Sequence, residues 1–385
     1  MPVPTLPFDV VSAIISHLKE ELQNDSAEEV QQGRMLSLVC RSWRSLGQGL
    51  CWRKVEIKLL RLPSLLGHFA RFPHLTKLVR HCTLSGPNMD SSDITDISDK
   101  EALALLPQFL STWVNLESLV IQGTMEEDLV PILEAASYLE NLDTLGLNEM
   151  GEFNCSNEFI ASLQSGFKKL STFGVMVANS VRSSLQVAQQ LANFPKLRID
   201  DLVVAWHVEP AGASRIARDF LSIVHPTSLK MVDLHHHAAC RSIVEYLSGY
   251  PNLHRLTFKL YSEENLDNLA QILSILTRFS SLKMVEIILN EQDAIGSPLS
   301  LSEIILHFPP SLRIFFTEQI VFPDLLQIPS RQAELRQILK NSRSGWALYP
   351  SDMMVDDSTR IVLMGEEKEG KVNWFRNEQG AFEME

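Results

Sequence analysis

Residues 250–258 have the sequence Tyr250-Pro251-Asn252-Leu253-His254-Arg255-Leu256-Thr257-Phe258, and the same pattern recurs along the middle of the chain. An aromatic or apolar residue is followed by two spacers and then by Leu-x-x-Φ-x-Φ, in which Φ is apolar. Weaker copies start at Leu75, at Leu312, and at Leu197 with two extra residues before Leu202. The clean copies are Trp113 with Leu116, Leu119 and Ile121; Leu139 with Leu142, Leu145 and Leu147; Phe167 with Leu170, Phe173 and Val175; Pro226 with Leu229, Val232 and Leu234; Tyr250 with Leu253, Leu256 and Phe258; and Phe279 with Leu282, Val285 and Ile287.

The spacing of these copies predicts the architecture. The leading leucines recur seven times between residues 116 and 312, which is a mean period of 28 residues. Leucine-rich repeats have periods of ~20–29 residues. Residues 265–277, between two copies, have apolar residues at helical spacing. Alternating strands and helices predict an α/β fold, a leucine-rich repeat solenoid over residues 58–325 with parallel strands inside and helices outside.

Composition restricts the possible partners and surroundings. The chain of 385 residues is 45% hydrophobic and has a net charge of −13, which repels phosphate backbones and anionic lipid. We therefore expect no nucleic-acid and no membrane partner. The five cysteines lack CxxC spacing and indicate free thiols in a reducing compartment. No signal peptide or long apolar run is visible, so the expected location is the cytoplasm, the nucleus or both.

Residues 1–57 differ from the repeats. Leu6, Val10, Ile14 and Leu18 recur at helical spacing, and helical spacing returns after an acidic stretch at residues 19–33. So few short helices form a poor core by themselves, which indicates that part of their apolar surface meets another protein. The segments that decide the next inference are Leu6-Pro7-Phe8-Asp9-Val10-Val11, Ile14-Ile15-Ser16-His17-Leu18, Ser37-Leu38-Val39-Cys40-Arg41-Ser42-Trp43 and Leu50-Cys51-Trp52-Arg53-Lys54-Val55.

In this order, these segments resemble the F-box, and the whole chain resembles F-box proteins with divergent leucine-rich repeats of the fungal type. The resemblance implies a helical F-box module over residues 1–57 that docks on a Skp-type adaptor and, through it, on a cullin. It implies that the chain is the substrate-recognition subunit of a Skp-cullin-F-box type ubiquitin ligase, with the repeats binding a target protein. The acidic stretch at residues 19–33 is longer than the usual connection in this family. The resemblance implies that the adaptor-binding residues are Leu6, Pro7, Ile14, Leu18, Val39 and Trp52.

The remaining chain, residues 326–385, follows neither pattern. Arg360–Gly365 and Lys371–Arg376 are predicted strands around the charged residues 366–370, so they could form a hairpin. Because the ends of a solenoid need covers, this segment is interpreted as a cap for the last repeat, with a partly disordered acidic tail as the alternative.

The sequence leaves other classes of function open beside the substrate-recognition subunit. The chain contains no recognisable catalytic motif, so it is not expected to be an enzyme or to need a cofactor. One alternative is an F-box scaffold that does not serve degradation. Another is a metal-dependent enzyme using His235, His236 and His237, with Cys240 nearby. Adjacent strand residues point to opposite faces, however, which favours a polar turn at the end of a strand.

The repeat pattern also predicts where a target protein binds. Because strand side chains alternate, the neighbours of the Φ residues point to the concave face of the sheet. Early repeats place small uncharged residues there, and later repeats place charged and bulky ones, which are the types that dominate binding energy. The candidate target-binding residues are Met231, His235, Arg255 and Lys259.

Overall fold

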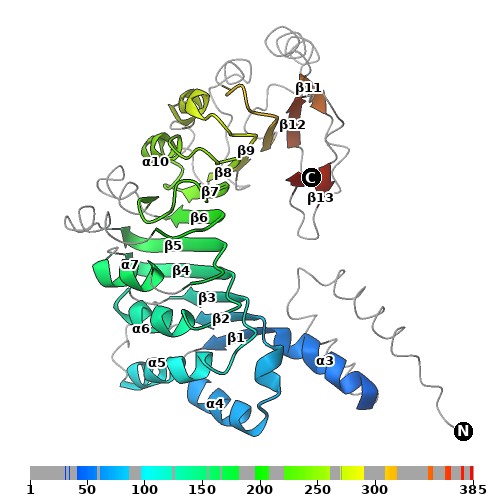
Figure 1. Ribbon diagram of the computed structural model, residues 1–385, viewed down its shortest axis with the longest axis vertical. Coiled ribbons are helices and arrows are strands. Elements are labelled where there is room, and N and C mark those ends of the chain that lie inside the picture. Colours follow the sequence, from blue (N-terminus) through cyan, green and yellow to red (C-terminus); the bar gives the residue numbers. More distant parts are fainter. Residues whose placement is uncertain are drawn as a thin grey trace, which may run out of the picture.

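A computed structural model shows how the repeats stack. It describes residues 31, 34, 41–58, 61–85, 97–123, 126–153, 156–164, 167–181, 196–207, 221–260, 269, 271–289, 308–318, 346–349, 360–365, 374–376 and 382–384. Over these residues the chain forms one sheet of 12 strands and a separate pair of strands, and helices lie between several successive strands of the large sheet (Figure 1). The α/β repeat solenoid predicted from the sequence is confirmed.

From β1 to β10 the strands follow one another in sequence order, and every pairing among them is parallel. Parallel neighbours require a crossover segment, which the residues between two strands supply. The bounds are β1 Lys54–Lys58, β2 His81–Ser85, β3 Ser118–Gln122, β4 Thr144–Phe153, β5 Thr172–Val181, β6 Asp201–Trp206, β7 Met231–His236, β8 Arg255–Leu260, β9 Met284–Leu289 and β10 Ile314–Glu318.

Helices line one side of the strand stack in Figure 1, and α3 extends from the opposite side into β1. The predicted helix at residues 265–277 is confirmed where it is described, since residues 269 and 271–275 are helical and lead into η4. The helices are α3 Arg41–Arg53, α4 Leu62–Arg71, η2 Leu75–Leu78, α5 Ile97–Leu110, α6 Glu126–Ala136, α7 Asn157–Gln164, α10 Arg241–Leu247 and η4 Leu276–Arg278.

The Φ positions form a continuous apolar core, as the repeat pattern predicts. In β4, Leu145 and Leu147 are fully buried, and in β8, Leu256 and Phe258 are fully buried. The register aligns these positions across the sheet, so that Leu119 lies opposite Leu145 and Leu256 opposite Val285. Each strand therefore buries its apolar face against equivalent residues of its neighbours.

Two weak copies were assigned the wrong register. The copy read from Leu75 begins at Val79, because Cys82 and Leu84 are the buried residues opposite Leu119 and Ile121. The copy read from Leu197 begins at Ile199, which is fully buried and leads to Leu202 and Val204 without extra residues. The predicted weak copy at Leu312 stands, since Phe315 is buried and Thr317 lies opposite Ile287.

The first repeat begins inside the segment that the sequence resemblance assigned to the F-box. Val55 and Ile57 of β1 pair opposite Cys82 and Leu84, so Trp52 occupies the leading position of this copy. Its ring stacks on His68 at 5.5 Å between centroids and meets Phe69 edge-on at 5.4 Å. The predicted boundary at residue 57 therefore falls within a strand of the sheet.

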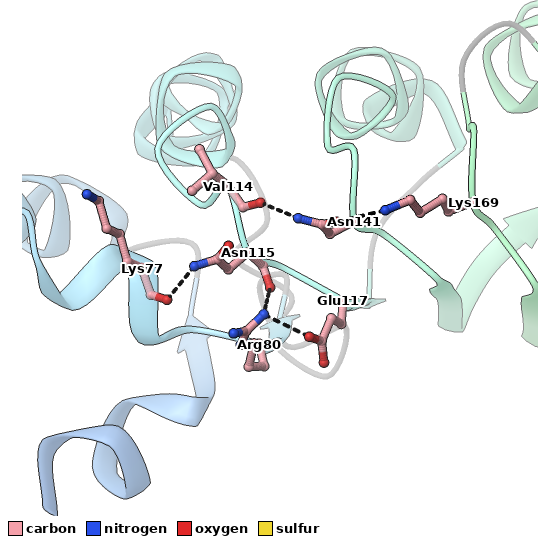
Figure 2. Close-up of polar contacts among 7 residues, drawn as sticks. All are labelled: Lys77, Arg80, Val114, Asn115, Glu117, Asn141 and Lys169. Atoms are coloured by element: carbon pink, nitrogen blue, oxygen red, sulfur yellow. Dashed lines mark hydrogen bonds and ion pairs between the residues drawn. The ribbon is translucent and has the colours of Figure 1, made fainter. Parts of the chain in front are cut away.

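Asparagines link successive repeats where the turns approach each other (Figure 2). Each is the residue before a leading leucine, and its side-chain amide donates to a backbone carbonyl of the preceding repeat: Asn115 to Lys77 at 2.8 Å, Asn141 to Val114 at 2.9 Å, and Asn252 to Thr227 at 2.6 Å. These bonds satisfy turn carbonyls that no strand pairs, and they hold the turns of neighbouring repeats together.

Two strands of the described tail extend the large sheet. Strand β12 (Arg360–Gly365) has the predicted bounds, but it pairs antiparallel with β10 and with β11 (Trp346–Tyr349). It therefore covers the edge that β10 would otherwise expose. The predicted hairpin with Lys371–Arg376 is wrong, because β13 (Trp374–Arg376) pairs with β14 (Phe382–Met384) instead.

The cysteines that the structure describes, Cys51, Cys82 and Cys240, are not in disulfide bonds. Cys82 is buried in β2, and burial raises the pKa of its thiol well above the ordinary value. It packs as a small apolar residue.

Substituting a buried Φ residue tests the register. Leu145→Ala and Leu256→Ala should each lower the free energy of unfolding by about 2–5 kcal/mol, because each leaves a cavity in the core. Urea unfolding followed by circular dichroism measures the change. Tyr138→Ala is the control, since Tyr138 is 82% exposed and should change stability by less than about 0.5 kcal/mol. Losses below that limit for both leucines would contradict the register.

Candidate functional site

The four residues predicted to bind a target lie side by side on two strands. Met231 lies opposite Arg255, and His235 lies opposite Lys259, so β7 and β8 place them in two adjacent pairs. All four are partly buried and belong to the face away from the Φ core. The structure therefore brings the predicted residues together, while their role stays a prediction.

An ion pair holds the centre of this face. Arg255 Nη2 donates to Glu286 Oε2 at 2.8 Å, and the two side chains are only 23% and 12% exposed. Thr257, which is 1% exposed and lies opposite Glu286, is 3.5 Å from the same oxygen. Removing either partner of such a partly buried pair destabilises the fold, because the other partner is left as an uncompensated charge away from water.

Two carboxylates lie beside this pair. Asp201 of β6 and Asp233 of β7 belong to neighbouring strands, in which Asp201 is opposite Met231 and Val203 is opposite Asp233. Burial and then repulsion from Asp233 raise the pKa of Asp201 to about 6, while Arg255 and the Leu202 N–H act in the opposite, weaker direction. Because the folded-state pKa lies above the unfolded one, ionising Asp201 destabilises the fold as the pH rises through about 6.

His235 completes the cluster. Burial first, and then Lys259, lower its pKa to about 4, so the imidazole is neutral at pH 7. Its Nε2 is buried and has no hydrogen-bond partner among the described residues. A neutral imidazole can donate or accept one hydrogen bond at this atom, depending on the tautomer.

The three adjacent histidines lie at the end of β7, with His235 and His236 in the strand and His237 after it. His236 takes φ 53°, a left-handed conformation that turns the chain at the strand end, and its ring lies 4.1 Å from that of His207. Within the described part of the chain, no group of three or more His, Cys, Asp or Glu residues is placed to hold a metal ion. The metal-dependent alternative built on His235, His236 and His237 thus has no support here.

Of the predicted adaptor-binding residues, Trp52 is among the residues that the structure describes. Leu6, Pro7, Ile14, Leu18 and Val39 lie outside the described residues, as does the acidic stretch except for residue 31. Trp52 is described, and its partly buried ring packs on His68 and Phe69 of α4. Its assignment to adaptor binding stays a prediction.

Sequence reasoning missed Asp201, which belongs to the same cluster. The reason is the misread register at Leu197, which left β6 out of the rows expected on the concave face. With Ile199 as the leading residue, Asp201 takes the same position as Met231 and Arg255. Glu286 was expected on this face, but its ion pair with Arg255 depends on the pairing of β8 with β9.

Comparison with known proteins does not identify a family. No family model matches the chain, and no curated protein matches it. Among solved structures, "Crystal structure of Rad7 and Elc1 complex in yeast" is similar over 76% of this chain and 96% of the other, with 9% identity and a TM-score of 0.21. A TM-score this low establishes neither fold nor function, so the fold assignment depends on register and burial. In the parts of the chain that are described, no helix is long and apolar enough to cross a membrane.

The Arg255–Glu286 pair can be tested against a matched exposed pair. Arg255→Ala should lower the free energy of unfolding by about 2–3 kcal/mol, because Glu286 then keeps a largely buried, unpaired charge. Arg80→Ala breaks the Arg80–Glu117 pair, which has the same 2.8 Å distance but is 39% and 46% exposed, and should cost less than about 1 kcal/mol. Urea unfolding measures both variants, and equal losses of unfolding free energy in Arg255→Ala and Arg80→Ala would contradict a structural role for the Arg255–Glu286 pair.

Proposed function

We propose that this chain is the substrate-recognition subunit of a Skp-cullin-F-box type ubiquitin ligase. In this proposal residues 1–57 bind a Skp-type adaptor, the solenoid at 58–325 binds a target protein, and residues 326–385 cover its last repeat. The chain does no chemistry itself and uses no cofactor. It holds a target lysine near the ubiquitin-charged enzyme, and the gain in rate comes from proximity and orientation.

The observation that carries the proposal is the continuity between the F-box-like segment and the first repeat. Helix α3 begins at Arg41, within the segment that resembles the F-box, and ends at Arg53, where β1 starts with no residue between them. The Arg53 carbonyl accepts a hydrogen bond from Arg80 N–H at 2.9 Å, which ties the end of α3 to the next repeat. A partner bound to α3 would be held in a fixed position relative to the strands.

The concave face supports the second half of the proposal. Its cluster on β6–β9 combines Arg255, a methionine and several partly buried polar groups, and protein interfaces are enriched in arginine and methionine. The face of the sheet that points toward the helices is buried in the solenoid's own core. The opposite, concave face is therefore the one left for a target.

A scaffold that binds the adaptor without promoting degradation has the same sequence features. The two functions differ in their product. In a reconstituted ligase containing the adaptor, the cullin and a ubiquitin-charged enzyme, a substrate receptor promotes ubiquitin transfer to its target, whereas a scaffold binds the target and leaves it unmodified.

Adaptor binding can be tested at the F-box-like segment. The double variant Leu6→Ala/Pro7→Ala should abolish co-purification with a Skp-type adaptor, because both residues match the family's docking positions. Phe72→Ala, which shortens an exposed apolar side chain outside this segment, is the control and should bind normally. The thermal unfolding midpoint of both variants should match that of the wild type. Wild-type adaptor recovery with the double variant would contradict the assignment of the docking segment.

A further inference from the structure

A row of residues, one from each repeat, lines the edge of the sheet where the parallel strands begin. The backbone N–H of each member donates to the carbonyl of the member one repeat earlier, as from Lys283 to His254 at 2.8 Å and from Arg313 to Lys283 at 2.7 Å. Neighbouring members are therefore about one strand spacing, ~4.8 Å, apart. In chain order the row is Arg80, Glu117, Asp143, Ser171, Asp200, Lys230, His254, Lys283 and Arg313.

The charge of this row is balanced in the earlier repeats and positive in the last ones. Two ion pairs of 2.8 Å join earlier members, namely Arg80–Glu117 and Lys230–Asp200. Lys283 and Arg313, the basic end of the row, are partly exposed, and among the described residues neither has a carboxylate within 4.0 Å. Burial first, and then Lys283 and Lys230, lower the pKa of His254, so this imidazole is neutral at pH 7. Two adjacent cations thus lack an anion in a chain with a net charge of −13.

The last part of the chain starts from the same edge. Strands β10 and β12 are antiparallel with Ile314 opposite Met364, so the next residues in this register, Arg313 and Gly365, are neighbours across the two strands. In Figure 1, β13 lies on the side from which α3 enters β1, which is the side where the parallel strands begin. Residues 366–385 follow β12, and they open with three glutamates and one lysine: Glu366, Glu367, Lys368 and Glu369.

We propose that the basic end of the row binds the acidic residues 366–369 of this same chain. Their reach permits it. Lys283 precedes β9, two strands from β12, which is about 10 Å, and four extended residues span up to about 14 Å. Covalent attachment also gives residues 366–369 a high effective concentration at this edge, which a free acidic peptide does not have.

The contact has a consequence for binding and goes beyond the proposed function. It occupies Lys283 and Arg313, so that acidic segments of other proteins must displace residues 366–369 before they can bind there. It also keeps the end of the chain beside the strand starts and away from the concave face. Neither effect depends on what the amino-terminal segment or the concave face binds.

Carbodiimide cross-linking of the full chain, followed by mass spectrometry, tests the contact, because this reagent joins an amine directly to a carboxylate that touches it. We expect Lys283 to be joined to a glutamate of residues 366–369. The yield should fall at least about twofold in about 0.5 M salt, which screens exposed charges. The positive control is the Lys230–Asp200 pair, whose side chains are 2.8 Å apart and about half exposed. If the control forms and Lys283 is not joined to residues 366–369, the inference is wrong.

Mixing equal amounts of ¹⁵N-labelled and unlabelled chain distinguishes contact within one chain from contact between two. The inference predicts that both partners of the cross-link carry the same label. A cross-link between labelled and unlabelled partners would overturn it, because a second copy would then supply the acidic segment.

Binding of an acidic peptide gives a second measurement. The probe is a fluorescein-labelled peptide with the sequence of residues 365–370. Replacing all three glutamates, in Glu366→Gln/Glu367→Gln/Glu369→Gln, should raise the amount of bound peptide at least about threefold over the wild type, because the row loses its attached competitor. Adding Lys283→Gln and Arg313→Gln should remove this gain. Glu140→Gln, which removes an exposed carboxylate beside Lys168, is the control and should not raise binding.

Two results with this peptide would also overturn the inference. One is equal binding to the wild type and to the variant without the three glutamates. The other is a gain that persists after Lys283 and Arg313 are replaced, because the peptide would then bind elsewhere. Thermal unfolding midpoints equal to that of the wild type show that all variants are folded.

Discussion

Stacking of the repeats is the constraint on which the rest of this structure depends. A single strand and its helix cannot bury the apolar residues that alternate along the strand, so each repeat is stable only against its neighbours. Leu119, Leu145 and Phe173 lie opposite one another in consecutive strands and are fully buried. The parallel register therefore decides which side chains form the core and which are left to face a partner.

The same register builds the concave face. Each residue on it has neighbours at fixed positions on the strands before and after, so single residues from distant parts of the sequence become one cluster. Arg255 meets Glu286, a residue 31 positions later, and Asp201 lies diagonally across from Asp233 of the neighbouring strand, although no local motif links the members of either pair. The cluster combines the partly buried Arg255–Glu286 ion pair with two carboxylates on neighbouring strands.

The sequence predicts the repeats well where the apolar alternation is strong. It places Leu116, Leu142, Leu253 and Leu282 correctly, because leucine at a regular period of this length is typical of stacked strand-and-helix repeats. Val79 and Ile199 were missed, since a nearby leucine gave a plausible but wrong starting point, and Asp201 was lost with Ile199. The partners of β12 could not be predicted, because spacing identifies a strand but not the distant strand with which it pairs.

In the proposed function, the amino-terminal segment binds an adaptor while the sheet remains free for a target. Hydrogen–deuterium exchange of the full chain, with and without a Skp-type adaptor, tests it most directly. The account predicts slower exchange within residues 6–53 on adding the adaptor, and unchanged exchange in β3 to β9. Protection of β3 to β9, with no change in residues 6–53, would show that the adaptor binds the solenoid and would contradict the account.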